Sequence, residues 1–410
     1  MSKLAVKGGP RVREKTFPSW PVWDHSDCRA LVEVCNSGQW WCVGGTKVKQ
    51  FEEEFAAYCG CKVGVCVPNG TIALVVALKA LGIGSGDEVI VTPYTFIASA
   101  SSILEVNAVP VFVDIDPETY NMDPARVEAA ITDKTRAIMA VHIAGLPCDM
   151  DAITQIARRH RLKLIEDCAQ AHGAEWKGRK VGSLGDVGAF SFQASKNLTS
   201  GEGGIVVTTD EEIGNRAWSI HNVGRVKGGA WYYHPVMGSN YRMTEFQGAI
   251  LLNQMRKLDA ETARRNENAL YLSERLSRID GVKPLKRDER VTVHAYHLYI
   301  FRYLAGESTG VPRAKFIEAL NAEGIPCSPG YVPLYRSGMF EIDPNACPVG
   351  CPFYGKKVNY KDLRLENCER ACESESVWFT QNMLLGDRKD MDDIADAVEK
   401  VISHIDELRE

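Results

Sequence analysis

The stretch KVGVCVPNGTIALVVALKALG, residues 62–82, contains the pattern that decides the fold. It begins with a short valine-rich run, which is typical of a buried strand, and an Asn-Gly turn follows at residues 69–70. From Thr71 the apolar residues recur at helical spacing as far as Gly82. The stretch therefore predicts a strand, a tight turn and a helix, the unit from which helix-covered sheets are built.

The same unit recurs along the chain as far as Asp167. The further strand patterns are DEVIVT (87–92), VPVFVDID (109–116), RAIMAVH (136–142) and LKLIED (162–167). The helical patterns between them are TFIASASSILEV (95–106), DPARVEAAI (123–131) and DMDAITQIARRH (149–160). This alternation predicts right-handed βαβ units and an α/β fold with a buried, mostly parallel sheet. On such a sheet ligands bind at the carboxyl ends of the strands.

The pattern changes after Asn240. A long helical segment with one apolar stripe covers residues 243–279. A strand pattern (297–303), a helix pattern (311–324) and a closing helix (389–409) follow. We predict a large domain over residues 1–255, including an N-terminal arm, and a smaller α+β domain over residues 256–410.

The composition predicts an ordinary globular protein with small-molecule partners. Of the 410 residues 45% are hydrophobic and 25% charged, and the formal net charge is -5. Because no sustained run of Lys or Arg occurs, neither nucleic acid nor a membrane surface is expected as a partner. The first residues lack a signal-peptide core, and no window approaches the roughly 20 apolar residues of a membrane span. Thirteen cysteines without an export signal predict reduced thiols and a cytoplasmic location.

Four of these cysteines form two C-x-x-x-C pairs, Cys347 with Cys351 and Cys368 with Cys372. Four thiolates are able to hold a structural zinc ion. The usual zinc knuckle, however, has two intervening residues in at least one pair, and Pro352 directly follows Cys351. We therefore favour structural cysteines and predict no metal.

A single lysine lies in the loop AFSFQASKNLTSGEGG, residues 189–204. The strand patterns VGAFSF (187–192) and GGIVVTT (203–209) flank this loop, so Lys196 is expected at a strand end of the same sheet. A lysine in that place is either an ordinary solvated charge or a nucleophilic amine.

Other strand ends offer groups that suit a phosphorylated pyridine ring. Gly70 and Thr71 open a helix whose free N–H groups suit an anion, although Asn-Gly-Thr also serves as a plain cap. Asp167 ends a hydrophobic strand, where its charge needs a cation unless it caps a helix. Phe96 is placed to stack on a flat ring. Together with Lys196 these groups describe pyridoxal 5′-phosphate (PLP), bound to the lysine as a Schiff base.

Eight motifs in this order resemble the DegT/StrS family of PLP-dependent sugar aminotransferases, from about Trp20 to Leu408. They are GGTKVKQFEEEFAAYCG, PNGTIAL, DEVIVTPYTFIAS, VPVFVDIDPETYNMD, VHIAGLPCDMDAI, IEDCAQAHGA, SFQASKNLTSGEGG and GSNYRMTEFQGAIL. The resemblance implies the fold type I architecture of aspartate aminotransferase. It also implies transfer of an amino group from glutamine or glutamate to a keto group of a cyclitol or sugar.

The resemblance assigns roles to single residues. It makes Lys196 the Schiff-base lysine and Asp167 the partner of the pyridine nitrogen, and both are catalytic. The other implied cofactor contacts are Gln170 (ring hydroxyl), Phe96 (stacking), Gly70, Thr71 and Ser191 (phosphate), Ile72, and Asn240. In similar proteins the Asn of the GSNYR motif reaches the neighbouring subunit's cofactor, so Asn240 implies a homodimer with shared active sites.

The segment SGQWWCVGG, residues 37–45, most resembles 3-amino-5-hydroxybenzoate synthases and aminotransferases that act on keto-inositols. An indole such as that of Trp41 is a plausible wall for a six-membered carbocycle, or else it packs at a domain edge. We expect His142 to face the substrate and Arg242 to bind a carboxylate or the phosphate. His297 and Tyr331 are weaker substrate candidates.

Three alternatives to a cyclitol aminotransferase remain open. The acceptor is a nucleotide-linked ketosugar, although Ala144 stands where the sugar enzymes often have Tyr. The chain is a PLP-dependent dehydratase or resembles 3-amino-5-hydroxybenzoate synthase. The third alternative is a non-catalytic PLP-binding regulator. The intact Lys196 favours transamination, because a related dehydratase has histidine at that position.

Overall fold

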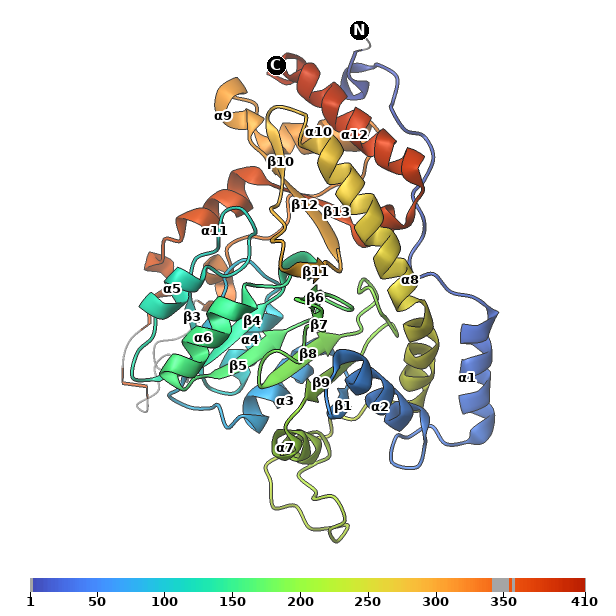
Figure 1. Ribbon diagram of the computed structural model, residues 1–410, viewed down its shortest axis with the longest axis vertical. Helices are drawn as coiled ribbons and strands as arrows, with labels where there is room; N and C mark the ends of the chain where they lie inside the picture. Colours follow the sequence, from blue (N-terminus) through green and yellow to red (C-terminus); the bar gives the residue numbers. More distant parts are fainter. Residues whose placement is uncertain (1–2, 341–353, 356–357, 410) are drawn as a thin grey trace.

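The computed structural model describes residues 3–340, 354–355 and 358–409, and its largest element is a seven-stranded sheet (Figure 1). The strand order is β1-β9-β8-β5-β4-β2-β3. The strands are β1 (Val63–Val67), β2 (Glu88–Val91), β3 (Val109–Phe112), β4 (Thr135–Val141), β5 (Lys163–Asp167), β8 (Val187–Ser191) and β9 (Gly204–Thr208). Only β9 runs against its neighbours, so the predicted mostly parallel sheet is confirmed.

Helices cover both faces of this sheet, because alternate strand residues point to opposite sides. Val89 and Val91 of β2 pack in one core cluster with α3 and α4, whereas Ile90 packs on the other face with α6. The covering helices are α2 (Lys47–Cys59), α3 (Gly70–Ala80), α4 (Ala98–Glu105), α5 (Pro124–Ala129), α6 (Met150–His160) and α7 (Glu211–His221). Both faces of the sheet are therefore shielded from solvent, which explains why the strands consist of nearly continuous apolar residues.

One predicted strand is shorter in the structure. The pattern over residues 109–116 forms β3 only as far as Phe112. Beyond it Asp114 leaves the sheet, and its carboxylate accepts hydrogen bonds from the backbone N–H groups of Asn367 and Cys368 at 3.0 and 2.9 Å. These bonds hold the start of α11 (Glu366–Arg370), a contact between segments far apart in the sequence.

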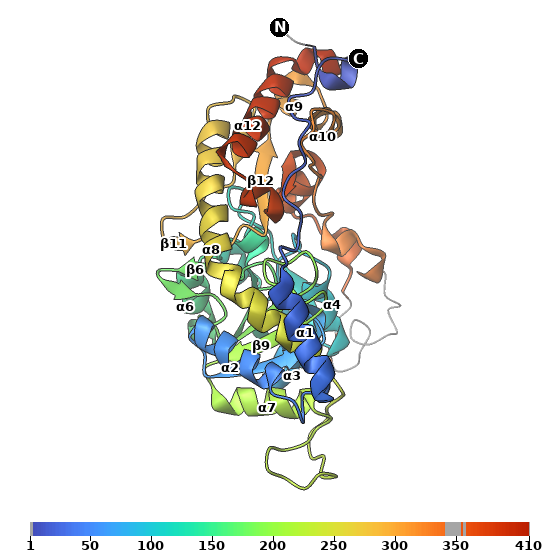
Figure 2. The same cartoon turned by 90° about the vertical axis from the view of Figure 1, so that its right-hand side faces the viewer.

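The C-terminal part is a smaller α+β unit above the sheet (Figure 2). Its sheet has the order β10-β12-β13, formed by β10 (Val282–Pro284), β12 (Leu298–Tyr303) and β13 (Ser376–Thr380). Its other helices are α9 (Ala305–Thr309), α10 (Arg313–Ala322) and α12 (Arg388–Ser403). A third small sheet, β11 (Val291–Val293), β6 (Glu175–Trp176) and β7 (Arg179–Lys180), joins the two parts.

Helix α8 (Glu245–Leu276) connects the two parts without a break. Leu251 and Leu252 pack in the core of the large part, whereas Leu272 and Leu276 pack in the core of the small part. The predicted domain limit at residue 255 thus falls inside one helix, and it stays a prediction. No helix within the described ranges has both the length and the hydropathy to cross a membrane.

The cysteine pairs are described only in part. Cys347 and Cys351 lie outside the described residues. The Sγ atoms of Cys368, in α11, and Cys372, in the helical turn that follows, lie 3.9 Å apart, and both residues are buried.

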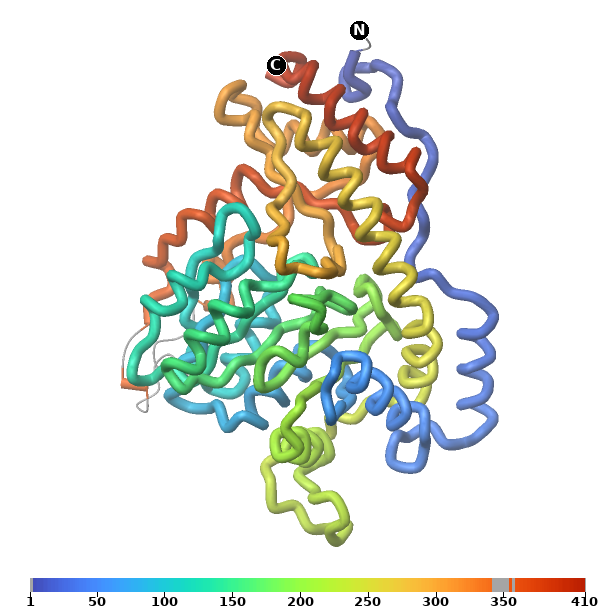
Figure 3. Tube along the Cα trace, viewed as in Figure 1, coloured from blue at the N-terminus to red at the C-terminus, as the bar shows by residue number. Residues whose placement is uncertain are grey.

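The N-terminal arm packs first on the small part of the chain and then reaches the large part, where Trp20 Nε1 donates a hydrogen bond to Ala194 O at 2.9 Å. Leu4 is fully buried among residues of that core, and the arm runs beside α12 (Figure 3). The buried Arg13 guanidinium forms ion pairs with Asp390 at 2.8 Å and Asp393 at 2.7 Å. The arm then descends to α1 (His25–Ser37) on the large part, so the first forty residues bridge both units.

We expect Arg13→Ala to lower the free energy of unfolding by about 3 kcal/mol, because it removes the buried cation of two largely buried carboxylates and leaves them only the exposed amines of Lys15 and Lys389. Urea unfolding followed by circular dichroism measures the change. Arg11→Ala, at an exposed position of the same arm, is the matched control. Equal unfolding midpoints for the two variants would contradict the role of Arg13.

Candidate active site

A cavity of ≈ 920 Å³ opens at the carboxyl ends of the large sheet, between the two parts of the chain. Ten predicted site residues line it. They are Gly70, Thr71, Ile72, Phe96, Asp167, Gln170, Ser191, Lys196, His297 and Tyr331. The rule that ligands bind at strand ends therefore brings together most of the residues that the sequence singled out.

The start of α3 forms one end of the cavity. The Asn69 side chain caps the helix by accepting a hydrogen bond from Ile72 N at 2.9 Å, which leaves the N–H groups of Gly70 and Thr71 without intrahelical partners. A Cβ atom at position 70 would lie 2.5 Å from the Cβ of Ser191, so only glycine fits there. Free N–H groups beside the hydroxyls of Thr71 and Ser191 form a cradle suited to a phosphate.

Asp167 lies at the end of β5 with its carboxylate buried in the cavity wall. The Ser99 hydroxyl donates a hydrogen bond to Oδ2 at 2.7 Å, and Ala169 N donates one to Oδ1 at 3.1 Å. Burial nevertheless raises the pKa of this carboxyl above its ordinary value. A buried acid of this kind is stabilised by a cation in the cavity.

Lys196 lies in the turn between β8 and β9, where its backbone N–H donates a hydrogen bond to the Gln193 carbonyl oxygen at 2.8 Å. Burial lowers the pKa of its amine to about 8, and the opposing charge of Asp167 limits the decrease. About a tenth of the amine is therefore unprotonated at pH 7, far more than in a free lysine, which makes Lys196 a nucleophile rather than a solvated charge.

Phe96 provides an aromatic face to the cavity. Its side chain is 58% exposed, although it follows a buried strand. Thr95 beside it bonds the Ser99 hydroxyl at 3.0 Å, so this loop also carries the serine that holds Asp167. An exposed ring in the cavity lining fits a flat ligand.

Gln170 and Tyr331 form a fixed pair across the cavity. Ala144 N donates a hydrogen bond to Gln170 Oε1 at 2.7 Å, and Gln170 Nε2 donates one to the Tyr331 hydroxyl at 2.8 Å. The amide orientation is thereby set, and its second N–H remains for a ligand. Tyr331 packs edge-on against Trp378, which lines the cavity as well.

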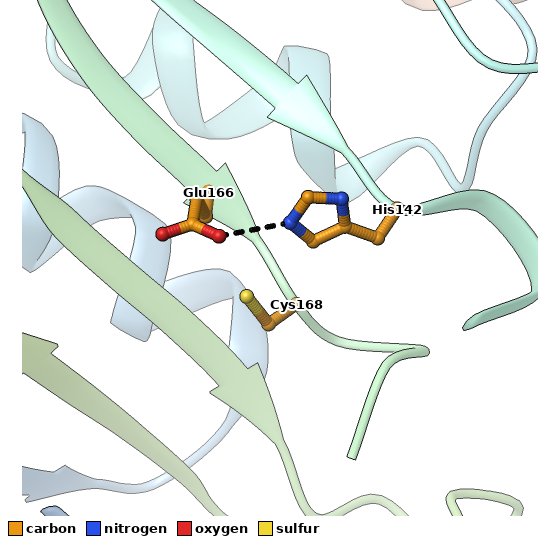
Figure 4. A group of neighbouring side chains, drawn as sticks. All are labelled: His142, Glu166 and Cys168. Carbon is orange, nitrogen blue, oxygen red and sulfur yellow. Dashed lines mark hydrogen bonds and ion pairs between the residues drawn. The ribbon is translucent and has the colours of Figure 1, made fainter. Parts of the chain in front are cut away.

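The prediction that His142 faces the substrate is wrong. Its ring is fully buried outside the cavity, where Nδ1 accepts a hydrogen bond from Cys148 N at 3.1 Å and Nε2 bonds Glu166 Oε2 at 3.1 Å (Figure 4). Glu166 and Asp167 are neighbours on β5 and point to opposite sides. The side chain of His142 lies with Glu166 and not with Asp167.

His142, Glu166 and Cys168 are the one group of three potential metal ligands within the described ranges. The carboxylate of Glu166 already accepts hydrogen bonds from the N–H groups of Gly182, Leu184 and Gly185 at 2.7 to 2.9 Å. These bonds occupy the atoms that a metal would need. The group instead fixes the strand that carries Asp167.

Trp41, Asn240 and Arg242 lie outside the cavity of their own chain. The Arg242 guanidinium is 5.4 Å from the Trp41 ring, and its Nη1 donates a hydrogen bond to Asn222 Oδ1 at 2.9 Å. Asn240 is exposed and forms a backbone bridge with Asn222. The three residues therefore form a second group, which lies outside the cavity lined by Lys196 of the same chain.

Several other residues that line the cavity were not predicted from the sequence, and four of them bear on the site. Ser99 supports Asp167, whereas Trp20, Trp378 and Gln381 complete the wall from the arm and the small part. Ser99 follows Phe96 by about one helical turn, so its spacing from Phe96 could have identified it as a site residue. The other three come from distant segments and carry no local signal.

Comparison with known proteins gives consistent matches over the whole chain. The model of the DegT/DnrJ/EryC1/StrS aminotransferase family matches residues 23–376. An L-glutamine:2-deoxy-scyllo-inosose aminotransferase of Streptoalloteichus tenebrarius is 41% identical, and an L-glutamine:scyllo-inosose aminotransferase of Streptomyces griseus is 39% identical, each over 99% of both chains. The crystal structure of 3-amino-5-hydroxybenzoic acid synthase superposes with a TM-score of 0.85 at 35% identity, covering 95% of this chain and 100% of that one.

We expect acylation of Lys196 in the cofactor-free protein to increase with pH and to reach its midpoint near pH 8, because only the neutral amine reacts. Asp167→Asn moves the midpoint to lower pH, since it removes the charge that favours the protonated amine. Peptide mass spectrometry after a short pulse of acetic anhydride measures both. A midpoint near 10, as in a free lysine, would contradict the geometry.

Proposed function

The chain belongs to the DegT/DnrJ/EryC1/StrS aminotransferase family and is an enzyme, and on this basis we propose that it moves the amino group of L-glutamine to the keto carbon of an inosose-type cyclitol with PLP as cofactor. The observation that carries the proposal is the meeting of a nucleophilic Lys196 with the buried acid Asp167 in one cavity. The two inosose aminotransferases similar to it over full length support the choice of substrates.

The residues of the cavity fit PLP at each of its polar groups. The amine of Lys196 would hold the aldehyde carbon, and Asp167 would hold the ring nitrogen. The cradle at Gly70, Thr71 and Ser191 would hold the phosphate. Three further residues complete the fit, Phe96 against the ring face, Ile72 beside the cradle and Gln170 at the ring hydroxyl.

The chemistry then divides between cofactor and protein. When bound, PLP supplies an electron sink for the charge left on a carbon that loses a proton. Asp167 would hold a proton on the ring nitrogen, which would favour that charge. Lys196 would remove the proton from the α-carbon of glutamine in the first half-reaction and deliver a proton to the acceptor carbon in the second. Its lowered pKa suits both directions near neutral pH.

A second copy of the chain is part of the proposal. Asn240 and Arg242 lie beyond their own cavity on the loop after α7, which extends from the body in Figure 1. Tyr232 and Met237 on that loop are 87% and 90% exposed. Lys196 is the only Lys or Arg among the described residues that line the cavity. A homodimer in which Asn240 reaches the partner's phosphate cradle would cover the loop and complete the site.

Two finer points belong to the same proposal. A cytoplasmic location is supported by the cysteines, which are free thiols wherever the structure describes them. Similarity to 3-amino-5-hydroxybenzoic acid synthase makes an enzyme of that kind the second candidate. The next two experiments test the first candidate.

We expect L-glutamine to abolish the visible absorption of the PLP-loaded enzyme and scyllo-inosose to restore it, because the two substrates use opposite half-reactions. Stopped-flow absorbance measures each half separately. In Lys196→Ala the rates of both absorbance changes fall by at least about a thousandfold, as expected for a residue that transfers the proton. A wild type that binds PLP but does not respond to glutamine would contradict the proposal.

We expect activity to appear when the inactive Lys196→Ala protein is mixed and refolded with Asn240→Ala. In the mixed dimer, the subunit with an intact Lys196 receives an intact Asn240 from its partner. Steady-state turnover measures the gain, and each variant refolded alone is the control. Absence of any gain, with mixed dimers present by native mass spectrometry, would contradict a shared site.

A further inference from the structure

One wall of the cavity comes from the small part of the chain and carries no charged side chain. At this wall Thr380 ends β13 and Gln381 and Asn382 follow it, while His297 directly precedes β12. The proposed mechanism uses none of them. Their orientation is set by buried neighbours, and this decides which ligand groups the wall accepts.

Arg265 of α8 lies behind the wall and is fully buried. Its Nε donates a hydrogen bond to Gln381 Oε1 at 2.9 Å, and its Nη2 pairs with Glu261 Oε2 at 3.2 Å. Nη1 has no partner among the described residues. Burial of an arginine with an unpaired N–H group is costly, so its retention behind a cavity points to a positioning role.

The bond from Arg265 fixes the amide of Gln381. Because Oε1 accepts from a guanidinium that is only a donor, the other end of the amide is Nε2 with its two N–H groups. Nε2 makes no hydrogen bond within the described part of the chain, and Gln381 lines the cavity. The wall thus presents a hydrogen-bond donor.

His297 presents the complementary group. Its Nδ1 lies 3.3 Å from Asn197 Oδ1, and Asn197 Nδ2 donates to Ala295 O at 2.7 Å, which identifies Oδ1 as the acceptor. Nδ1 therefore carries the proton, and Nε2 is an acceptor. Burial, with smaller effects from Lys196 and Arg265, holds the pKa of His297 well below its usual value, so the ring stays neutral.

We propose that Gln381 and His297 select an acceptor by one of its ring hydroxyls, which accepts a hydrogen bond from Gln381 Nε2 and donates one to His297 Nε2. A hydroxyl does both, whereas a phosphate or carboxylate oxygen has no proton for His297. The wall therefore favours a hydroxyl of the acceptor ring over a phosphate or carboxylate oxygen. Arg265 and Asn197 act as positioning residues. The inference rests on the proposed function and names the groups that recognise its acceptor.

The direct test is Gln381→Glu, which keeps the side-chain shape and an oxygen for Arg265 but replaces the N–H donor with an oxygen. We expect the KM for scyllo-inosose to rise by about tenfold or more, the loss typical of one hydrogen bond. The loss of rate with L-glutamine in the first half-reaction is smaller than the loss with scyllo-inosose. Gln155→Glu, the same change on the exposed face of α6, is the matched control for added charge.

A second measurement does not depend on turnover. Calorimetry with scyllo-inositol, the unreactive ring alcohol, reports binding to the PLP-loaded protein. We expect Gln381→Glu and His297→Phe each to weaken this binding by about tenfold, while Arg265→Lys, which keeps the charge but loses the forked geometry, weakens it less. Thermal unfolding identifies any variant that fails to fold.

The outcomes separate the two proposals. If wild type does not respond to glutamine, the proposed function fails, and binding of scyllo-inositol still tests the wall. If wild type completes both half-reactions but Gln381→Glu and His297→Phe leave the KM and the binding unchanged, only the inference is overturned. An equal loss in both half-reactions would also overturn it, since a general defect would then explain the data.

Discussion

Burial of an acid and an amine against the same cavity is the constraint on which the rest of the structure depends. Strands β5 and β8 are neighbours, and Asp167 pairs in register with Ala189, so the acid and the lysine loop emerge at one edge of the sheet. Desolvation disfavours the charged form of each group, raising the pKa of Asp167 and lowering that of Lys196. Serine and backbone donors offset part of this cost at Asp167.

The two parts of the chain enclose these groups by different means. The large part supplies rigid strand ends, where backbone geometry places the anion cradle and the acid. The small part closes the opposite side with side chains whose hydrogen bonds are fixed from behind, as Arg265 fixes Gln381. Because α8 is continuous and the arm is tied to α12 through Arg13, the two walls are held in one arrangement.

Local patterns in the sequence were sufficient for the seven strands of the large sheet, for several helices and for most residues of the candidate site. Asp167, Lys196 and Gly70 stand at strand ends or turns, where position alone implies exposure to a ligand. His142 was misassigned because the end of a strand does not show which face a side chain takes, and it points with Glu166. Gln381 and Trp20 could not be predicted, since they reach the cavity only through contacts between distant segments.

The most direct test of the account follows the nitrogen atom. The PLP-loaded enzyme is incubated with scyllo-inosose and L-glutamine labelled with ¹⁵N at the α-amino group, and the products are analysed by mass spectrometry. The account predicts an amino-cyclitol that carries the label, in an amount equal to the 2-keto acid formed from glutamine. Recovery of the label only in unreacted glutamine or in ammonia, with an unlabelled or dehydrated ring, would contradict it.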